Sequence, residues 1–424
     1  MDKYILKQII IDQQNELKVP ENLISRDINI DNYINGYEAI VISGIRRCGK
    51  STLLKIFAEN YTGKDNYQKT YVNFNDIRLN DFVLGDFIDL ENLIKEIYGI
   101  NKKYVFFIDE IQNVKNWHQW INNLVDRKIK TFITGSNSRL LSSEISTYLT
   151  GRNKVIQLFP FNFKEFLSSR NFKINNLQLL TTNQKIEILN VFREYLVLGG
   201  MPQVILNNDI LISKQIFEDI LLKDIVVRKQ IREIAEFKDL VLYLISNTSS
   251  IYSYSTLKTI TGIKSLSTIK NYIDGLKETY LMYTLNRFSY SIKKQKVSSS
   301  KIYCQDNIFL KTIAFNFSKN KGQLLENLVF IELLRRGYSC FYHKEKKECD
   351  FIIKIGNNIE QAIQVSLSIE REETKTREIN GLKEAMNLYG LKKGLILTEN
   401  EEFNIKENDY HIIIKPIWKW LLKK

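Results

Sequence analysis

Residues 41–52 read Val-Ile-Ser-Gly-Ile-Arg-Arg-Cys-Gly-Lys-Ser-Thr, and the rest of the fold can be inferred outward from this stretch. An apolar run at 39–42 leads into the motif G-x-x-x-x-G-K-S at 44–51, and apolar residues at helical spacing follow from Leu53. Glycines at these two positions let the backbone turn so that its N–H groups converge on phosphates at a helix N-terminus. The order strand, loop and helix predicts a nucleoside triphosphate site rather than a glycine-containing turn of another α/β protein.

The predicted nucleotide site is the loop itself. Its residues are Gly44, Ile45, Arg46, Arg47, Cys48, Gly49, Lys50, Ser51 and Thr52. The Lys50 ammonium would neutralise the β- and γ-phosphates, and the Ser51 hydroxyl would be a ligand of Mg²⁺. The expected cofactors are therefore ATP and Mg²⁺. GTP is disfavoured because the chain shows no Asn-Lys-x-Asp guanine signature.

A second strand carries the carboxylates that such a site needs. Residues 103–111 read Lys-Tyr-Val-Phe-Phe-Ile-Asp-Glu-Ile, a strand buried on both faces that would release its acids at its carboxyl end beside the loop. Asp109 would hold Mg²⁺ through water, and Glu110 would polarise the attacking water. These roles make ATP hydrolysis the predicted reaction.

Further polar residues follow in the predicted sheet. Residues 130–137 read as a parallel strand whose end, Ser136 or Asn137, would reach the γ-phosphate or the lytic water; an ordinary strand-end turn is the alternative. A helix over 138–150 then leads to Arg152, ahead of the last strand. Arg152 is the predicted charge that stabilises the transition state, from its own or a neighbouring subunit. The alternative is an exposed arginine that caps a helix end.

The composition describes a folded, basic protein. With 424 residues, 44% hydrophobic and 12% aromatic, the chain is long enough for two or three domains. Its net charge of +13 suggests an acidic partner such as nucleic acid, although a merely soluble lysine-rich protein would have the same charge. Four cysteines without metal-ligand spacing fit a reducing cytoplasm, and no signal peptide or membrane-spanning stretch is evident. We therefore expect a cytoplasmic protein with no membrane partner.

The motifs, taken in order, resemble those of the prokaryotic AAA-type ATPases. They are the phosphate loop, Phe-Ile-Asp-Glu-Ile, Thr-Gly-Ser-Asn, Leu-x-Gly-Arg and Pro-Phe-Asn-Phe-Lys-Glu-Phe at 160–166. The chain resembles in particular the family with a C-terminal domain of unknown function, through Tyr-Leu-Val-Leu-Gly-Gly-Met-Pro at 195–202 and Lys-Asp-Ile-Val at 223–226. The resemblance implies an α/β fold, with the parallel sheet of a P-loop NTPase at 1–160 and a helical lid at 161–235.

Residues 236–296 read as three helices followed by a hairpin and several lysines. This is the plan of a winged helix-turn-helix, whose third helix, at 265–276, opens with Ser and Thr residues. The residues that would face a DNA groove are Ser267, Thr268, Lys270 and Asn271. Double-stranded DNA is thus a candidate partner, and protein binding or internal packing is the alternative.

The final part, residues 297–424, is similar to the restriction-endonuclease-like fold. An active nuclease of that type needs an Asp and then Glu-x-Lys on the next strand, to hold Mg²⁺ and activate water. Glu326 and Asp350 occupy suitable positions, but Gln364-Val-Ser366 stands where Glu-x-Lys belongs. We therefore expect an inactive, structural or binding version of this fold.

Three functions are compatible with these motifs. The favoured one is an ATPase whose Mg²⁺-dependent hydrolysis drives a conformational change coupled to DNA or to a partner protein. The alternatives are an ATP-regulated, metal-dependent nuclease and a slow ATP switch that binds only protein. A small-molecule kinase is disfavoured because no acceptor-binding lid is evident. The sequence leaves a homo-oligomer open.

Overall fold

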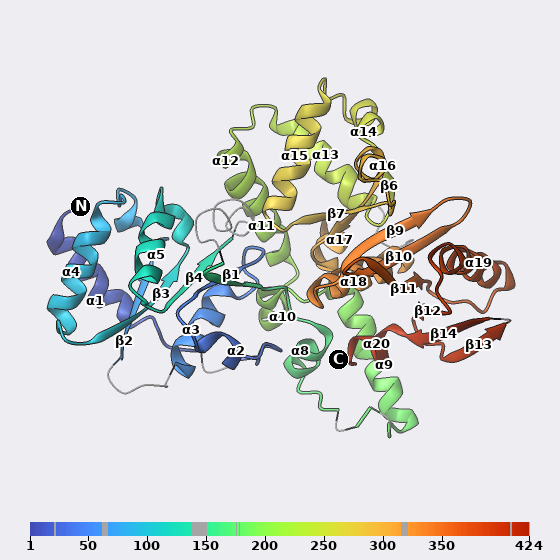
Figure 1. The fold of residues 1–424 in the computed structure, drawn as a ribbon, viewed down its shortest axis with the longest axis horizontal. Helices are drawn as coiled ribbons and strands as arrows, with labels where there is room; N and C mark the ends of the chain where they lie inside the picture. Colours follow the sequence, from blue (N-terminus) through green and yellow to red (C-terminus); the bar gives the residue numbers. More distant parts are fainter. Residues whose placement is uncertain are drawn as a thin grey trace. The chain divides into compact units, whose positions relative to one another are not determined.

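The structure, a computed structural model, forms two compact units, Met1–Phe159 and Pro160–Lys424 (Figure 1). The residues that it describes are 1–20, 23–61, 67–136, 151–174, 176–177, 179–314, 321–407 and 409–423, without the side chain of Lys296. The finer division of the second unit into a lid, a winged helix and a nuclease-like domain stays a prediction.

The first unit is built on a five-stranded sheet in the order β2-β3-β4-β1-β5. The strands are β1 (Ala39–Ser43), β2 (Tyr67–Asn73), β3 (Lys103–Asp109), β4 (Thr131–Gly135) and β5 (Asn153–Gln157). All neighbouring pairs are parallel, which confirms the predicted parallel sheet. The carboxyl ends of all five strands therefore meet at one edge. β4 separates the phosphate-loop strand β1 from the acid-bearing strand β3.

Helices cover both faces of this sheet, which is why its central strands are apolar without alternation. On one face, a single apolar core joins the sheet to α1 (Lys3–Gln14), α4 (Asp86–Tyr98) and α5 (Trp117–Asp126). On the other face, Phe107 and Phe132 stack with ring centroids 5.0 Å apart, and Phe57 of α3 (Lys50–Asn60) stacks on Phe132. Short helical segments are α2 (Asp31–Ile34), η1 (Ile77–Leu79) and η2 (Ile111–Asn113).

The second unit begins with helices in the stretch that the resemblance assigned to a lid. They are α8 (Phe163–Ser169), α9 (Thr182–Leu198), α10 (Pro202–Asn207), α11 (Leu211–Asp219), the π-helical segment η3 (Ile220–Val226) and α12 (Val227–Lys229). Asn162 caps α8 in a reciprocal capping box with Glu165. A role for these helices as a lid stays a prediction.

The glycine pair after α9 makes a close backbone approach. Gly199 has φ of +64°, and a Cβ there would lie 1.6 Å from Oδ1 of Asp306. The Gly200 N–H donates to Oδ2 of Asp306 at 2.8 Å, and its carbonyl accepts from the Phe161 N–H at 2.7 Å. The Leu-Gly-Gly-Met-Pro motif is therefore a packing junction, because a side chain at Gly199 would displace the Asp306 carboxyl group.

Three helices and a small antiparallel sheet follow. The helices are α13 (Ile234–Ser246), α14 (Tyr254–Thr261) and α15 (Leu266–Glu278), and the strands are β6 (Ile251–Tyr252), β7 (Met282–Asn286) and β8 (Ser300–Cys304). The sheet order is β6-β8-β7, and α16 (Ile292–Val297) lies between β7 and β8 in the chain. The three predicted helices are present, but residues 280–288, predicted to hold the strands of the wing, contain β7 alone, and a winged-helix identity stays a prediction. The second strand of the hairpin, β8, lies beyond residue 296, where the sequence had placed the next domain.

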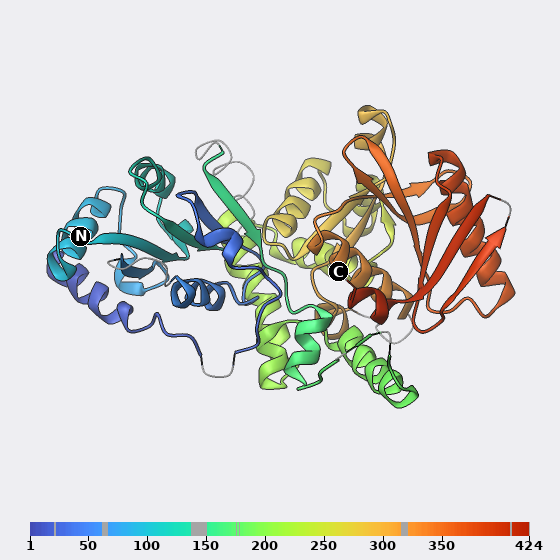
Figure 2. The same cartoon turned by 60° about the horizontal axis from the view of Figure 1, so that its bottom comes forward.

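The remainder of the chain contains a six-stranded mixed sheet in the order β13-β14-β12-β11-β10-β9, drawn in orange to red in Figure 2. Its strands are β9 (Ser339–Lys344), β10 (Glu348–Ile355), β11 (Asn358–Val365), β12 (Lys393–Thr398), β13 (Phe403–Glu407) and β14 (Tyr410–Pro416). The helices are α17 (Asn307–Ile313), α18 (Lys321–Arg335), α19 (Glu372–Tyr389) and α20 (Ile417–Leu421). The mixed α/β architecture is as predicted; a nuclease-like identity stays a prediction. Among the helices described, none is long and apolar enough to cross a membrane.

Candidate active site

The loop from Gly44 to Gly49 joins β1 to α3 at the carboxyl edge of the sheet. Gly49 has φ of +100° and immediately precedes α3, and Arg47 is also in the left-handed region, with φ of +62°. A Cβ on Gly44 would lie 2.2 Å from the carbonyl oxygen of Leu158. Both positions therefore require glycine: Gly49 because its backbone is left-handed, and Gly44 because a side chain there would collide with Leu158.

The first turn of α3 carries the predicted phosphate and metal ligands. Lys50 begins the helix, and its ammonium donates to the carbonyl oxygens of Gly44, at 3.1 Å, and Ile45, at 3.0 Å. Within the described part of the chain, no side chain caps the N-terminus of this helix. Its first N–H groups and its positive dipole end therefore suit an anion.

Asp109 ends β3 and is buried among hydroxyl groups. It accepts hydrogen bonds from Thr134 Oγ1 and, at 3.2 Å, from the phenol of Tyr71. Burial raises the pKa of Asp109, and hydrogen bonds from Thr134 and Ser51 oppose that rise. The structure thus brings Ser51 and Asp109, the two predicted Mg²⁺ ligands, into contact. A hydroxyl and a carboxylate are hard oxygen donors, so this pair fits Mg²⁺.

Glu110 stands at the same edge in a strained conformation. Its φ of +53° and ψ of +44° are left-handed, which costs on the order of 1 kcal/mol for a residue with a side chain. Its carboxylate accepts hydrogen bonds from Ser136 Oγ, at 3.2 Å, and from Gln112 Nε2. Its N–H donates to Thr134 Oγ1 at 3.0 Å. Several partners therefore fix the carboxylate that the sequence assigned to the attacking water.

Of the predicted strand-end pair, only Ser136 can be placed. Its hydroxyl donates a hydrogen bond to the Glu110 carboxylate, so Ser136 belongs to the site. Asn137 lies outside the described residues, as does the predicted helix over 138–150.

Arg152 lies at the opposite edge of the sheet from the loop. Its carbonyl oxygen accepts from the Ala39 N–H at 3.0 Å, at the start of β1 and β5. Because these strands are parallel, the amino ends where Arg152 lies are separated from Gly44 by the full length of β1. Its side chain is 56% exposed, and its guanidinium pairs with Asp126. The structure therefore does not bring Arg152 to the phosphate loop of its own chain, and a role for it in a transition state stays a prediction.

Arg26 is a site residue that sequence reasoning missed. Its guanidinium donates to the carbonyl oxygens of Cys48, at 3.0 Å, and Phe159, at 2.6 Å. It thereby ties the phosphate loop to the segment that follows β5. Arg26 stands in an irregular polar stretch with no periodicity, so the sequence contains no signal for this contact.

Arg26→Ala should loosen the phosphate loop. Hydrogen bonds from a charged group contribute about 1.5–3 kcal/mol each, and the variant leaves two carbonyl groups without this donor. We expect weaker ATP binding and a lower melting temperature of the first unit, measured by ATP titration and thermal unfolding. Arg78→Ala is the matched control, because Arg78 pairs with Asp12 and Asp76 on an exposed surface. Equal effects of the two substitutions would contradict the role of Arg26.

Comparison with known proteins gives domain matches along the chain. Residues 36–167 match the model of an AAA domain, and residues 189–320 and 321–420 match two separate domains of unknown function. The chain is 37% identical over 442 residues to an uncharacterized protein, MJ1544, of Methanocaldococcus jannaschii, covering 100% of this chain and 96% of the relative. It is 32% identical over 356 residues to an uncharacterized protein of Haemophilus influenzae, covering 81% and 86%.

The solved structures that match the chain are more distant. AMPPCP-bound DnaA from Aquifex aeolicus is 15% identical, with a TM-score of 0.29 over 59% of this chain and 84% of that one. The Aeropyrum pernix ORC1 protein in complex with DNA is 10% identical, with a TM-score of 0.33 over 73% and 94%. Likeness at this level carries no argument about function.

Proposed function

We propose that this chain, which belongs to the same protein family as the Methanocaldococcus jannaschii relative, is a Mg²⁺-dependent ATPase that couples hydrolysis to double-stranded DNA. The AAA-domain match supports ATP binding. The observation that carries hydrolysis is the meeting of four predicted residues at one edge of the sheet, Lys50, Ser51, Asp109 and Glu110.

In the proposed reaction, each of these residues has one task. The Lys50 ammonium, now held by the carbonyls of its own loop, would turn to the β- and γ-phosphates. Ser51 and Asp109 would hold Mg²⁺, which when bound neutralises charge on the phosphate oxygens. Glu110 would accept a hydrogen bond from the attacking water and orient it. Ser136 and Gln112 would keep the carboxylate of Glu110 aimed at that water.

A homo-oligomer is the arrangement in which Arg152 could take part in the reaction. Its exposed guanidinium is far from the phosphate loop of its own chain, so Arg152 could contact only a γ-phosphate that is bound in a neighbouring copy. A positive charge supplied in this way would stabilise the developing negative charge of the transition state.

The proposed DNA contact is the exposed face of α15. Ser265 caps this helix, and Ser267, Lys270 and Asn271 are exposed on it, while Thr268 is half-buried. Lys293 and Lys294 are exposed in α16, between β7 and β8. The net charge of +13 favours a phosphate backbone as the partner. A helix that exposes polar groups is suited to a groove.

The test is ATP hydrolysis with and without double-stranded DNA, at low and at moderate salt. We expect DNA to stimulate turnover, and Lys270→Ala/Asn271→Ala to lose the stimulation while basal turnover stays unchanged. Asn404→Ala/Lys406→Ala is the matched control, since these two residues are also exposed on a secondary-structure element, β13. If DNA does not change turnover, the proposed ATPase activity remains and a partner protein becomes the favoured target. Very slow turnover under all conditions would favour the switch that binds only protein.

A further inference from the structure

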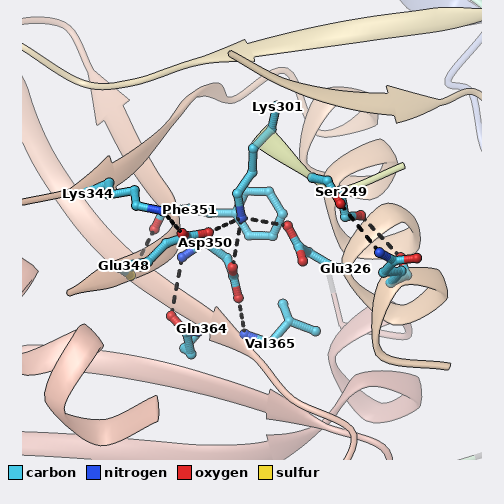
Figure 3. Close-up of polar contacts among 12 residues, drawn as sticks. Ser249, Lys301, Glu326, Lys344, Glu348, Asp350, Phe351, Gln364 and Val365 are labelled. Atoms are coloured by element: carbon cyan, nitrogen blue, oxygen red, sulfur yellow. Dashed lines mark hydrogen bonds and ion pairs between the residues drawn. The ribbon is translucent and has the colours of Figure 1, made fainter. Parts of the chain in front are cut away.

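A buried lysine in the second unit is surrounded by three carboxylates (Figure 3). Lys301 of β8 is 2% exposed, and its Nζ lies 2.9 Å from Glu326 Oε1, 2.8 Å from Glu348 Oε1 and 3.1 Å from Asp350 Oδ1. The three acids come from different places, Glu326 from α18 and the other two from the start of β10. The ammonium therefore joins a strand of the small sheet to a helix and a strand of the large-sheet part.

Neighbouring groups hold two of the three carboxylates, Asp350 and Glu326, in their inward orientation. Asp350 Oδ2 accepts from the Val365 N–H at 3.0 Å, and the Asp350 N–H donates to Gln364 Oε1 at 3.2 Å. The phenol of Tyr303 donates to Glu326 Oε1 at 2.7 Å. These bonds fix the carboxylate oxygens around a single point, and the Lys301 ammonium occupies that point.

The ammonium stays charged in this position. Burial alone would lower the pKa of Lys301, but the surrounding groups outweigh it and raise that pKa well above its ordinary value. Burial, with the charge of Asp350, raises the pKa of Glu326. Lys301 is therefore unsuited to act as a base or a nucleophile, and its chemistry here is that of a fixed positive charge.

The three carboxylates also line a cavity of about 1030 Å³. Gln364 and Ser366, which stand in place of the Glu-x-Lys of an active nuclease, line the same cavity. Gln364 Nε2 donates to Glu378 at 2.6 Å, and Ser366 Oγ donates to the carbonyl of Ser368 at 3.0 Å. Sequence reasoning paired Glu326 with Asp350 and found no lysine on β11, but the lysine on β8 could not be connected to them from its position in the chain.

We propose that the Lys301 ammonium takes the position that a divalent metal ion would otherwise occupy among these three carboxylates. The pocket therefore binds no metal ion. The oxygens lie 2.8–3.1 Å from Nζ, the distances of charge-assisted hydrogen bonds. Metal–oxygen bonds in a Mg²⁺ site are about 2.1 Å long, so an ion and the ammonium cannot share this centre. Within the described part of the chain, no group of three or more Asp, Glu, His or Cys residues is arranged as a set of metal ligands.

The rival arrangement is a metal-dependent nuclease in which Lys301 stands beside a bound ion as a catalytic lysine. That arrangement would require the ammonium to leave all three carboxylates. Because the charge of Lys301 is almost fully buried, separating it from its partners would leave a buried charge without compensation, which is strongly destabilising. The two arrangements differ in whether the intact protein binds a metal ion in this pocket.

The test is binding of Mn²⁺ to nucleotide-free protein, counted by the electron paramagnetic resonance of free Mn²⁺. We expect Lys301→Met to bind one more Mn²⁺ per chain than the wild type, because the three carboxylates then lack a cation. Adding Asp350→Asn should abolish the extra ion. Lys344→Met is the matched control: Lys344 pairs with Glu348 at 3.0 Å, but its side chain is 49% exposed, and its removal should add no ion.

Thermal unfolding keeps the test decisive if Lys301→Met is unstable. In that case its melting temperature should be low in a chelator and recover in Mn²⁺, and Lys301→Met/Glu326→Gln should be more stable than the single variant in the chelator. A folded Lys301→Met that binds no extra Mn²⁺, or an unstable one that Mn²⁺ does not rescue, would overturn the proposal. The proposal would also be overturned if the wild type bound Mn²⁺, or cleaved plasmid DNA, and Asp350→Asn abolished that binding or cleavage. Because nucleotide is absent from the binding measurement, neither outcome bears on the ATPase.

Discussion

Lys50→Ala should abolish ATP hydrolysis. The phosphate loop presents one ammonium at the start of α3, and the substitution removes the charge that would balance the β- and γ-phosphates. Loss of one such electrostatic contact lowers turnover by about 10²–10³-fold, and weaker ATP binding lowers it further. We expect hydrolysis at the background level, and no rise in melting temperature on addition of ATP and Mg²⁺, since stabilisation by a ligand requires binding.

The controls for Lys50→Ala separate the lost charge from a damaged loop. The Lys50 ammonium also donates to Gly44 and Ile45, so its loss could alter the loop itself. Lys50→Met retains the apolar part of the buried side chain and should be as inactive as the alanine variant. Lys102→Ala removes an exposed lysine just before β3 and should hydrolyse ATP normally. Turnover above one tenth of the wild type in both Lys50 variants would remove this residue from the mechanism.

The parts of the nucleotide site that were predictable are those encoded locally. Gly44 and Gly49 are needed by the backbone within one loop, and the apolar strand before Asp109 is continuous because helices cover both faces of the sheet. Each of these signals lies within about ten residues of sequence. The conformation of Glu110 was not predictable, because a left-handed φ at a glutamate has no compositional signature.

The parts that were missed depend on how distant segments are arranged. The position of Arg152 away from the phosphate loop of its own chain was not predictable, because the motif order does not show that this residue precedes a parallel strand beside β1. Arg26 reaches the loop from an irregular segment, and Lys301 reaches Asp350 across 49 residues of chain. A single sequence shows neither strand order nor the direction of an isolated charged side chain, so contacts of this kind become visible only in three dimensions.

Glu110→Gln should bind ATP and fail to turn it over. The substitution preserves the shape of the side chain and an oxygen that can accept the hydrogen bond from Ser136, so the loop and Lys50 should be undisturbed. It removes the negative charge that would polarise the attacking water, and the loss of a general base lowers turnover by about 10²–10⁴-fold. The expected signature is a melting temperature that rises with ATP and Mg²⁺ as in the wild type, together with a kcat at least about a hundredfold lower.

Two comparisons make this result specific to Glu110. Glu59→Gln, an exposed site on α3, changes the same kind of group in the same unit and should leave kcat unchanged. Ser136→Ala removes a hydrogen bond that aims Glu110, so it should lower kcat by a smaller factor than Glu110→Gln with little change in ATP binding. A wild-type kcat in Glu110→Gln would show that another group activates the water. We expect the opposite result, because Glu110 occupies a strained backbone conformation that three partners hold in place. Strain of this kind is typical of active-site residues, so we expect the Glu110 carboxylate to be the group that activates the water.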